Sequence, residues 1–496
     1  MTEPLVPAAA LPRRPRLLLA LIAAFTTLPL LGLRDLWHTD EPRYAQVARE
    51  ILTSGDAVVM HLNQEVYREK PPLLFWMEAA IGRVAGDVGP WSARLPSALF
   101  GIAGVVLLFE LGRRLLGRDR ERTAFLGALF LATTFHWWWI SQRAAFDVVM
   151  GTWVLAAVLC EEIAREREKS TDGRAADPRG ALRWRLGFFA ATGFAFLTKG
   201  PPALLFAFVA LVARAFAARD LGSLKRVPWL RGLLVLAAVL ALWIGPQWAR
   251  LGLHDLLANF KKQTAGRMGD DAPHSQPPWY FLKTLPLDSL PWSIVAIGGG
   301  IVAWRRERRA SVAWRFALAW IGAALILFSC FRGKRNLYLI PLAPPIALFA
   351  ATVAEQLGGR WISCLTRAAT IVALLFGAGG LALMPALDAT RTPRPLGERV
   401  RREVEAGRHV ALVGLRHPDS VLYFSGLPRL DIVDAARLAV LADLHRSDQA
   451  GPDAGRLVFV TEAEEGAAIV GELPRGADPL DSLVVDDTEY RLWRAR

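Results

Sequence analysis

The sequence predicts a multi-pass α-helical membrane protein that carries a small α/β domain at its C-terminal end. Of the 496 residues, 53% are hydrophobic, and most of these gather in runs near the roughly 20 residues that a spanning helix needs. Short Arg-rich stretches separate the runs. After residue 395 the pattern changes to short strand-like segments. We therefore expect a helical part, 1–394, and a soluble part, 395–496.

The apolar runs set the expected helices in chain order. A further stretch at 71–85 fits either a short helix or a re-entrant one, so we expect about 11–13 membrane helices in total. The eleven segments that fit a spanning helix best are 17–35, 92–112, 123–141, 147–164, 184–198, 201–217, 229–249, 289–304, 314–331, 337–354 and 368–387.

The basic residues follow a topological pattern. The net charge is +13, but the arginines lie in short loops between apolar runs, and cytoplasmic loops collect Lys and Arg. With those loops inside, residues 36–90, 250–288 and everything after 388 fall on the outer face. A nucleic-acid partner is disfavoured, because binding it needs a contiguous basic surface. The three cysteines, which have no paired spacing, indicate neither a disulfide framework nor a metal knuckle.

The soluble part reads as alternating strands and helices. Segments 409–415, 430–434 and 456–462 fit short strands with helical stretches between them, which is typical of an α/β domain. Neither a GxGxxG pattern nor a P-loop accompanies the strands. We therefore expect no nucleotide there.

A charge-dense block, 40–72, dominates the first outer loop. Ionisable groups at a membrane face are costly unless they perform chemistry or pair with one another. At the start of the block, Asp40 and Glu41 lie between Thr39 and Pro42, which predicts a helix start with Thr39 as the N-cap. The same place suits a carboxylate that acts as a general base.

The end of the block carries Glu69 and Lys70 before two prolines. Lys70 fits a side chain that snorkels to the membrane surface, and it equally fits a cation aimed at a phosphate. Glu69 would then pair with Lys70 or bind a metal. The prolines make the chain rigid and so fix the direction of Lys70.

Further polar residues fall at other outer turns. Asp147 begins an apolar run and fits either a helix cap or a site residue. The tryptophans at 137–139 before it are expected to lie in an interfacial belt. Lys199 repeats the Lys-Pro-Pro theme in LTKGPP. Two cations at rigid turns on one face make a phosphate site more credible than either cation alone.

A third outer turn adds Lys334, Arg335 and Tyr338. This loop departs from the positive-inside bias, which points to an anionic partner. His274 in loop 250–288 is a weaker signal, since an isolated histidine is more often structural.

These motifs, taken in order, resemble the polyprenyl-phosphate-dependent glycosyltransferases. They are DEPRYAQVAREILTSGD with HLNQEVYREKPPL, then FD at 146–147, LTKGPP and SCFRGKRNLYLIPLAPP. Within these enzymes the sequence is most similar to the lipid A 4-amino-4-deoxy-L-arabinose transferases, which are related to protein O-mannosyltransferases. The resemblance covers about residues 17–390. It implies the GT-C architecture, with many membrane helices and outer-face amphipathic helices.

The resemblance also implies roles for the site residues. Asp40 matches the main catalytic carboxylate, Asp147 matches a second acidic position, and Arg43 belongs to the block of Asp40. Lys70, Lys199 and Tyr338 match residues that hold the lipid phosphate, with Lys334 and Arg335 beside Tyr338. Glu69 matches a metal-contacting glutamate of some members, and His274 is its most plausible partner, so a divalent metal is left open as a cofactor.

We therefore expect a glycosyltransferase of the bacterial inner membrane with its active site and C-terminal domain on the periplasmic side. The donor would be a sugar on undecaprenyl phosphate or another polyprenyl phosphate, and the acceptor lipid A, another envelope glycan or a protein. Transfer in one displacement would invert the anomeric carbon. A protein O-mannosyltransferase-like activity is the alternative enzyme. A transporter or lipid flippase is the alternative from another class, and it would place polar residues along a path across the bilayer.

Overall fold

The computed structural model divides into two compact units, each described here by itself. The first unit comprises residues 1–31, 68–77 and 94–380, and the second comprises 32–67, 78–93 and 381–496. The second unit thus joins parts of the first outer loop to the C-terminal domain. The structure describes residues 11–38, 40–169, 175–264, 274–302, 311–447, 457–473 and 476–495.

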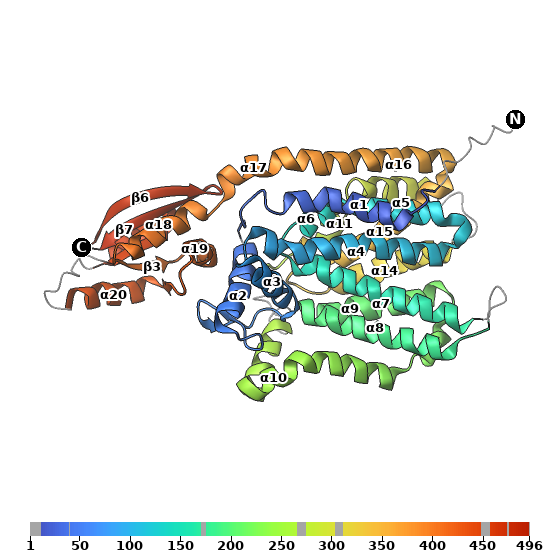
Figure 1. The fold of residues 1–496 in the computed structure, drawn as a ribbon, viewed down its shortest axis with the longest axis horizontal. Coiled ribbons are helices and arrows are strands. Elements are labelled where there is room, and N and C mark those ends of the chain that lie inside the picture. The colour runs from blue at the N-terminus through green and yellow to red at the C-terminus, as the bar shows by residue number, and fades with distance from the viewer. Residues whose placement is uncertain are drawn as a thin grey trace. The chain divides into compact units, whose positions relative to one another are not determined.

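The first unit is an assembly of helices (Figure 1). All eleven expected segments contain a helix, and the multi-pass helical fold is confirmed. The α-helices are α1 (Pro15–Thr27), α4 (Pro90–Leu116), α5 (Glu121–Ala132), α6 (Phe135–Ser141), α7 (Phe146–Glu168), α8 (Pro178–Lys199), α9 (Pro202–Ala217), α10 (Trp229–Thr264), α11 (Tyr280–Asp288), α12 (Trp292–Ile294), α14 (Val312–Ser329), α15 (Ala343–Leu357) and α16 (Gly359–Leu374). Short 3-10 or π turns join them: η1 (Leu28–Leu30), η2 (Arg118–Arg120), η3 (Leu221–Arg226), η5 (Val295–Gly299), η6 (Asn336–Leu342) and η7 (Leu375–Gly379).

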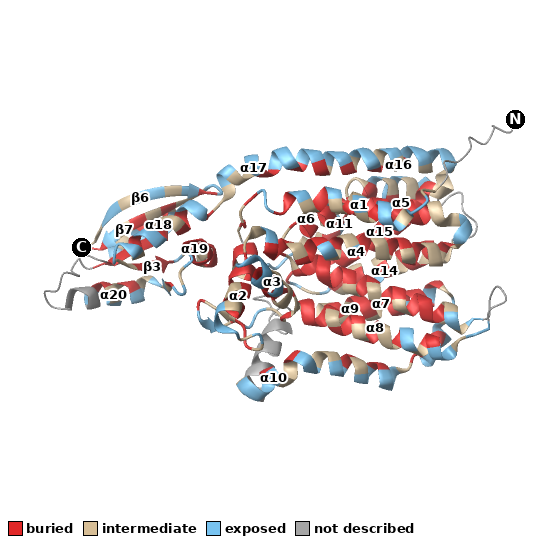
Figure 2. Ribbon diagram, viewed as in Figure 1, coloured by how far each residue is buried: buried red, intermediate tan, exposed pale blue. Residues whose placement is uncertain are grey.

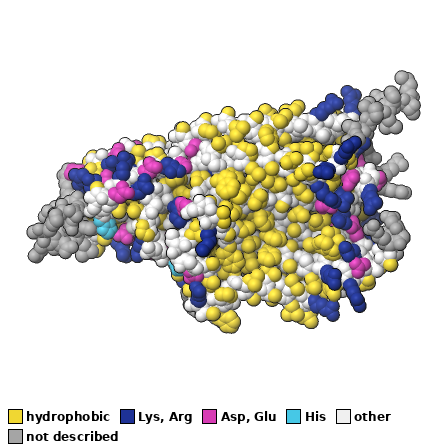
Figure 3. Space-filling view, in the orientation of Figure 1, with side chains coloured by type: hydrophobic (Ala, Val, Ile, Leu, Met, Phe, Trp, Pro, Cys, Tyr) yellow, Lys and Arg dark blue, Asp and Glu magenta, His cyan; other side chains and the backbone are white. Residues whose placement is uncertain are grey.

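Among the described residues, five helical segments are long and apolar enough to cross a membrane. Two helix pairs pass the same test only together, with a bend of 112° between α6 and α7 and of 115° between α11 and the helix over Trp292–Val302. Two shorter apolar helices are Pro15–Leu30 and Pro202–Ala217. Apolar side chains cover the visible flank of this unit, while Lys and Arg gather at its right-hand end (Figure 3).

The expected segment 123–141 is broken into α5 and α6 at Thr133 and Thr134. Both hydroxyls donate to carbonyls of the preceding turn, Thr133 to Leu129 (2.6 Å) and Thr134 to Phe130 (2.8 Å). Such back-bonding competes with the helix ladder and favours a break.

Helices α7 and α9 of this unit are largely buried (Figure 2). The interfacial belt expected at 137–139 is wrong for Trp137 and Trp138, which are also buried. The indole N–H of Trp138 donates to the carbonyl of Thr26 at 2.7 Å, and that of Trp137 donates to the carbonyl of Gly101 at 3.3 Å. A buried indole is tolerated where its N–H finds such an acceptor.

The second unit contains a five-stranded sheet with the order β4-β3-β5-β7-β6, which confirms the small α/β domain. Strand β3 pairs in parallel with β4 and β5, while β7 pairs antiparallel with β5 and β6. The strands are β3 (His409–Val413), β4 (Asp431–Val433), β5 (Leu457–Glu462), β6 (Ala477–Val485) and β7 (Thr488–Ala495). The helices around them are α17 (Gly380–Arg391), α18 (Arg394–Glu405), α19 (Pro418–Ser425), α20 (Ala435–Ser447) and α21 (Ala463–Glu472).

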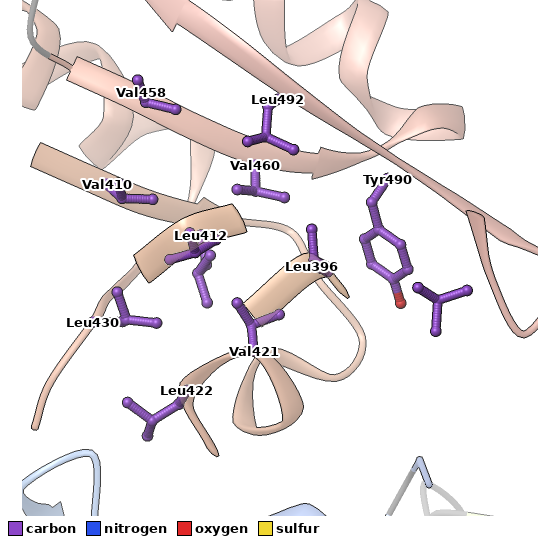
Figure 4. Close-up of a cluster of buried hydrophobic side chains, with 12 residues drawn as sticks. Leu396, Val410, Leu412, Val421, Leu422, Leu430, Val458, Val460, Tyr490 and Leu492 are labelled. Atoms are coloured by element: carbon purple, nitrogen blue, oxygen red, sulfur yellow. The ribbon is translucent and has the colours of Figure 1, made fainter. Parts of the chain in front are cut away.

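Both faces of this sheet are covered by apolar side chains. Val410 and Leu412 join a buried cluster that includes Leu396 and Tyr490 (Figure 4), while Ala411 and Val413 join a separate cluster with Phe459. Alternate residues of a strand point to opposite faces, so β3 is buried on both sides.

The first outer loop supplies the rest of the second unit. It forms α2 (Glu41–Ser54), which ends at Gly55 in the left-handed conformation (φ 73°), and a hairpin of β1 (His61–Leu62) and β2 (Glu65–Val66). Helix α3 (Leu73–Ala85), whose residues are divided between the two units, occupies the ambiguous stretch at 71–85 and begins after the two prolines.

Candidate active site

Asp147 and Lys199 form an ion pair at the point where α7 begins and α8 ends. Their side chains are each 10% exposed. The start of α7 is fixed by Ser97 of α4, whose hydroxyl donates to the carbonyl of Ala145 and accepts from its N–H at 3.0 and 3.1 Å. Asp147 thus lies in the first turn of α7 without serving as its N-cap, which is Ala145. Its carboxylate is engaged by a cation from another helix.

Tyr338 completes this group. The ammonium of Lys199 lies 5.1 Å from the centre of the Tyr338 ring, which is a cation–π distance. Tyr338 belongs to η6, where its N–H donates to the carbonyl of Arg335 at 3.0 Å. Three segments that are distant in sequence therefore converge on one ammonium. The implied role of Lys199 and Tyr338 in holding a lipid phosphate remains a prediction.

The segment of Lys70 runs beside that of Lys199. A Cβ placed on Gly200 would lie 3.8 Å from Cγ of Pro71, in ordinary van der Waals contact. Gly200 has φ +80°, a conformation that side chains rarely adopt, and it ends α8 directly after Lys199. The two Lys-Pro-Pro-like motifs therefore lie next to each other at Gly200 and the ring of Pro71.

Lys334 is buried and anchors a small bridge. Its ammonium donates to the carbonyl of Gln276 at 2.9 Å, and its N–H donates to the carbonyl of His274 at 3.0 Å. Ser275 and Gly333 pair as an antiparallel bridge between the same segments. The structure thus shows Lys334 joining two loops, and its expected contact with a phosphate remains a prediction, as does that of Arg335.

A metal does not fit the described residues. Among them, no group of three or more His, Cys, Asp and Glu side chains lies close enough to hold a metal ion. Glu69 and His274 are both exposed, and His274 has φ 60° in its turn. A site for a divalent cation needs several converging oxygen or nitrogen ligands, so we derive no step through a metal.

In the second unit, Asp40 occupies the N-cap position of α2, and the structure records no cap hydrogen bond from its side chain. Thr39, the expected cap, lies outside the described residues. Glu41 is instead structural: it is 1% exposed and accepts from Arg34 at 2.6 Å and from the N–H of Trp37 at 3.2 Å. The two neighbouring acids therefore differ in their surroundings. Glu41 is buried and holds the loop through its hydrogen bonds, while Asp40 is partly exposed.

Sequence reasoning missed the residues that surround this helix start. Arg43 donates to Asp419 of α19 at 2.6 Å. His38 bonds Ser420 at 2.7 Å and stacks on His417 with ring centres 5.1 Å apart. These partners lie more than 370 residues further along the chain, so nothing in local spacing or composition pointed to them.

Comparisons with known proteins agree with this fold. A family model described as dolichyl-phosphate-mannose-protein mannosyltransferase matches residues 69–244. The undecaprenyl phosphate-alpha-4-amino-4-deoxy-L-arabinose arabinosyl transferase of Edwardsiella ictaluri is 31% identical over 370 residues, covering 74% of this chain and 63% of the relative. The Pectobacterium carotovorum protein of that name is 32% identical over 357 residues, covering 71% and 59%. The chain therefore spans about three fifths of the length of the curated relatives it matches.

Solved structures show the same architecture. The crystal structure of ArnT from Cupriavidus metallidurans bound to undecaprenyl phosphate aligns with a TM-score of 0.72 at 20% identity, over 97% of this chain and 98% of that one. The archaeal oligosaccharyltransferase AglB from Archaeoglobus fulgidus aligns with a TM-score of 0.58 at 13% identity, over 92% and 70%.

The fold is therefore that of the GT-C class of integral membrane proteins. Within that class, the sequence matches confirm the resemblance inferred from the motifs: the chain is similar to the polyprenyl-phosphate-dependent glycosyltransferases, and among them to the lipid A aminoarabinose transferases.

Proposed function

We propose that the protein is a glycosyltransferase that moves a sugar from a polyprenyl phosphate, such as undecaprenyl phosphate, to an acceptor of the cell envelope such as lipid A. The observation that carries this proposal is the ammonium of Lys199, held by Asp147 and Tyr338 beside the segment of Lys70. Lysine is suited to phosphate as a compact, rotatable charge. The relatives named above carry an undecaprenyl phosphate donor in their names.

The proposed location is the bacterial inner membrane, with this group on the periplasmic side. Asp147 lies in the first turn of α7, and Arg165 and Arg167 lie in its last turn. At 1.5 Å per residue, 18 to 20 residues separate these ends by about 30 Å, which matches the thickness of the hydrocarbon core. Because basic ends face the cytoplasm, the end with Asp147 and Lys199 would face outward.

The proposed reaction is a single displacement. The acceptor hydroxyl oxygen attacks the anomeric carbon, the bond from that carbon to the phosphate oxygen breaks with its electron pair, and polyprenyl phosphate leaves. Asp40 takes or orients the hydroxyl proton, with Arg43 in the same helical turn. Lys70 and Lys199, with Lys334, Arg335 and Tyr338 as further donors, stabilise the charge that grows on the phosphate. Asp147 orients Lys199.

The test is transfer of a labelled sugar from undecaprenyl phosphate in proteoliposomes. Asp40→Asn and Lys70→Ala should each lower the rate by about 100-fold or more, since each removes a group that acts at the reacting atoms. Two matched control variants should transfer sugar at the wild-type rate. Glu65→Gln removes an exposed acid of the same loop, and Lys225→Ala removes an exposed cation near the basic end of α9. Full activity of Asp40→Asn would remove the proposed base.

The same preparation separates the alternatives. Transfer to a peptide hydroxyl with no transfer to lipid would favour the protein O-mannosyltransferase-like activity. Movement of the labelled lipid across the bilayer without transfer would favour a flippase. The one-ended location of Asp147 and Lys199 supports the enzyme over a polar path through the bilayer.

A further inference from the structure

The C-terminal α/β domain is attached to the first outer loop by a set of specific contacts within the second unit. Asn63 of the loop makes a two-way pair with Leu430: its amide donates to the Leu430 carbonyl and its carbonyl oxygen accepts from the Leu430 N–H, both at 2.8 Å. Arg49 of α2 donates to the carbonyl of Tyr423 at 3.0 Å and stacks on the Tyr423 ring at 4.2 Å. The hydroxyl of Tyr423 donates to the carbonyl of Val88 at 2.8 Å.

The same attachment reaches the turn that carries Asp40. Arg43 lies three residues after Asp40, in the first turn of α2, where the N–H of Tyr44 donates to the carbonyl of Asp40 at 3.0 Å. The guanidinium of Arg43 donates from Nε to Oδ2 of Asp419 at 2.6 Å. The Asp419 side chain is 11% exposed and the Arg43 side chain 23%, so this ion pair is largely shielded from water. Shielded, hydrogen-bonded pairs are strong where surface pairs are weak.

Asp419 is itself held in place. It lies in the first turn of α19, where the positive end of the helix dipole favours a carboxylate. Its neighbours His417 and Ser420 contact His38, two residues before Asp40. Burial and the nearby Arg43 lower the pKa of His417, while the carboxylates of Glu462, Asp419 and Asp40 act in the opposite direction. His417, next to the start of α19, therefore lies near both Asp40 and Arg43.

We infer that the C-terminal domain is part of the catalytic machinery, and that Asp419 is a positioning residue that fixes Arg43 and, through it, the turn bearing Asp40. The inference rests on the proposed function of Asp40. Asp419 touches no reacting atom in this scheme, and its effect is to preserve the geometry of attack. A displacement of about 1 Å in such a group costs on the order of 100-fold in rate.

The test uses the full-length protein in proteoliposomes and three variants. Asp419→Asn should lower kcat about 10- to 100-fold and change KM for the undecaprenyl phosphate sugar by less than about threefold, because it leaves the lysines of the first unit unchanged. Asp419→Glu keeps the charge and should recover at least half of that loss on a logarithmic scale. Glu403→Gln is the matched control: Glu403 is a buried carboxylate of the same domain, and it pairs with Arg399 and Arg408 of that domain.

A readout independent of activity accompanies the kinetics. Hydrogen exchange at the amides of Glu41 and of residues 43–47 should speed up in Asp419→Asn and stay at the wild-type rate in Glu403→Gln, since only the first variant loosens the start of α2. Equal loss of kcat in both variants would show general damage to the domain and overturn the inference. So would wild-type kcat in Asp419→Asn. Wild-type protein that transfers no sugar would instead refute the proposed function, which keeps the two failures distinct.

Discussion

Helix α7 carries ion pairs at both of its ends, and the two ends are built differently. At its start, Asp147 meets the single ammonium of Lys199, which in turn lies over the ring of Tyr338. Carboxylate, ammonium and ring come from three separate segments. An ammonium is a compact charge with three rotatable donors, which can shift to follow a phosphate.

At the other end of α7, carboxylates are held by arginines in fixed geometry. Glu162 accepts from two nitrogens of Arg214 at 2.6 and 2.8 Å. Glu161 accepts from Arg165 at 2.7 Å and from Arg185 at 3.4 Å. The planar, two-pronged pair of Arg214 and Glu162 holds the carboxylate in a fixed orientation. A buried charge alone therefore does not mark a site: at the arginine end each carboxylate is held by guanidinium groups of this chain, while the lysine end is suited to receive an anion.

The largest expected effect removes the lysine-end pair altogether. The double variant Asp147→Asn/Lys199→Met should lower sugar transfer about 1,000-fold, because it removes a phosphate-stabilising charge. Its melting temperature in detergent should stay within about 3 °C, because replacing both members of a buried pair is often neutral. Transfer within tenfold of wild type would contradict the assignment of this end to the donor phosphate.

Removing an arginine at the other end of α7 should lower stability and leave the rate of sugar transfer nearly unchanged. Arg214→Met leaves Glu162 buried without its guanidinium and should lower the free energy of unfolding by about 3–5 kcal/mol. The rate of transfer per folded molecule should change less than about threefold. Thermal unfolding and activity normalised to folded protein measure the two quantities. A lower rate in fully folded Arg214→Met would show that Arg214 contributes to catalysis, and would contradict the expected difference between the two ends of α7.

A pH dependence of stability is expected from the second unit, where His38 is partly buried. Burial, with a smaller effect of His417, lowers the pKa of His38 from 6.5 to about 4. The unfolded chain therefore binds more protons between these values, so stability is complete above pH 6.5 and is lost as the pH falls toward 4. The loss should reach at most about 3 kcal/mol in unfolding experiments at pH 7.5, 6 and 4.5. In His38→Gln the free energy of unfolding should depend less on pH. An equally steep dependence in that variant would contradict the assignment of the effect to His38.

The smallest expected effect separates the ring of Tyr338 from its hydroxyl. Tyr338→Phe keeps the ring beside Lys199 and removes one donor, which should raise KM for the donor about 5- to 10-fold, as expected for one hydrogen bond of about 1 kcal/mol. Tyr338→Leu removes the ring as well and should cost more. Unchanged KM in Tyr338→Phe would limit the role of Tyr338 to orienting Lys199.

The sequence predicted the helices well because spanning length and apolar composition are local properties. It also placed Asp147 and Lys199 on one face by charge topology. It did not predict that these two residues pair, because a separation of 52 residues carries no periodicity. The interfacial position predicted for Trp137 and Trp138 was wrong for a related reason: the carbonyls that accept from their indoles, those of Gly101 and Thr26, come from other helices.

The surroundings of Asp40 were the least predictable. A helix start was expected there, and α2 does begin there, but the N-cap position belongs to Asp40 itself. The sequence predicted two roles for this pair of acids: they could begin a helix, or one of them could act as a general base. It gave no means to assign Glu41 to Arg34, since that pairing depends on the path of the loop.

The contact between Arg43 and Asp419 has a consequence for the timing of synthesis. The two residues are 376 positions apart, which at roughly 5–20 residues per second corresponds to about 20–75 s of translation. Asp40 emerges from the ribosome early, with most of the helical unit still unmade, yet its turn acquires its anchor only near the end. A ribosome that stalls before α19 leaves helices in the bilayer and a loop with no anchor. With the proposed roles of Asp40 and Asp419, a chain that ends before α19 would carry the base on a turn that lacks this anchor.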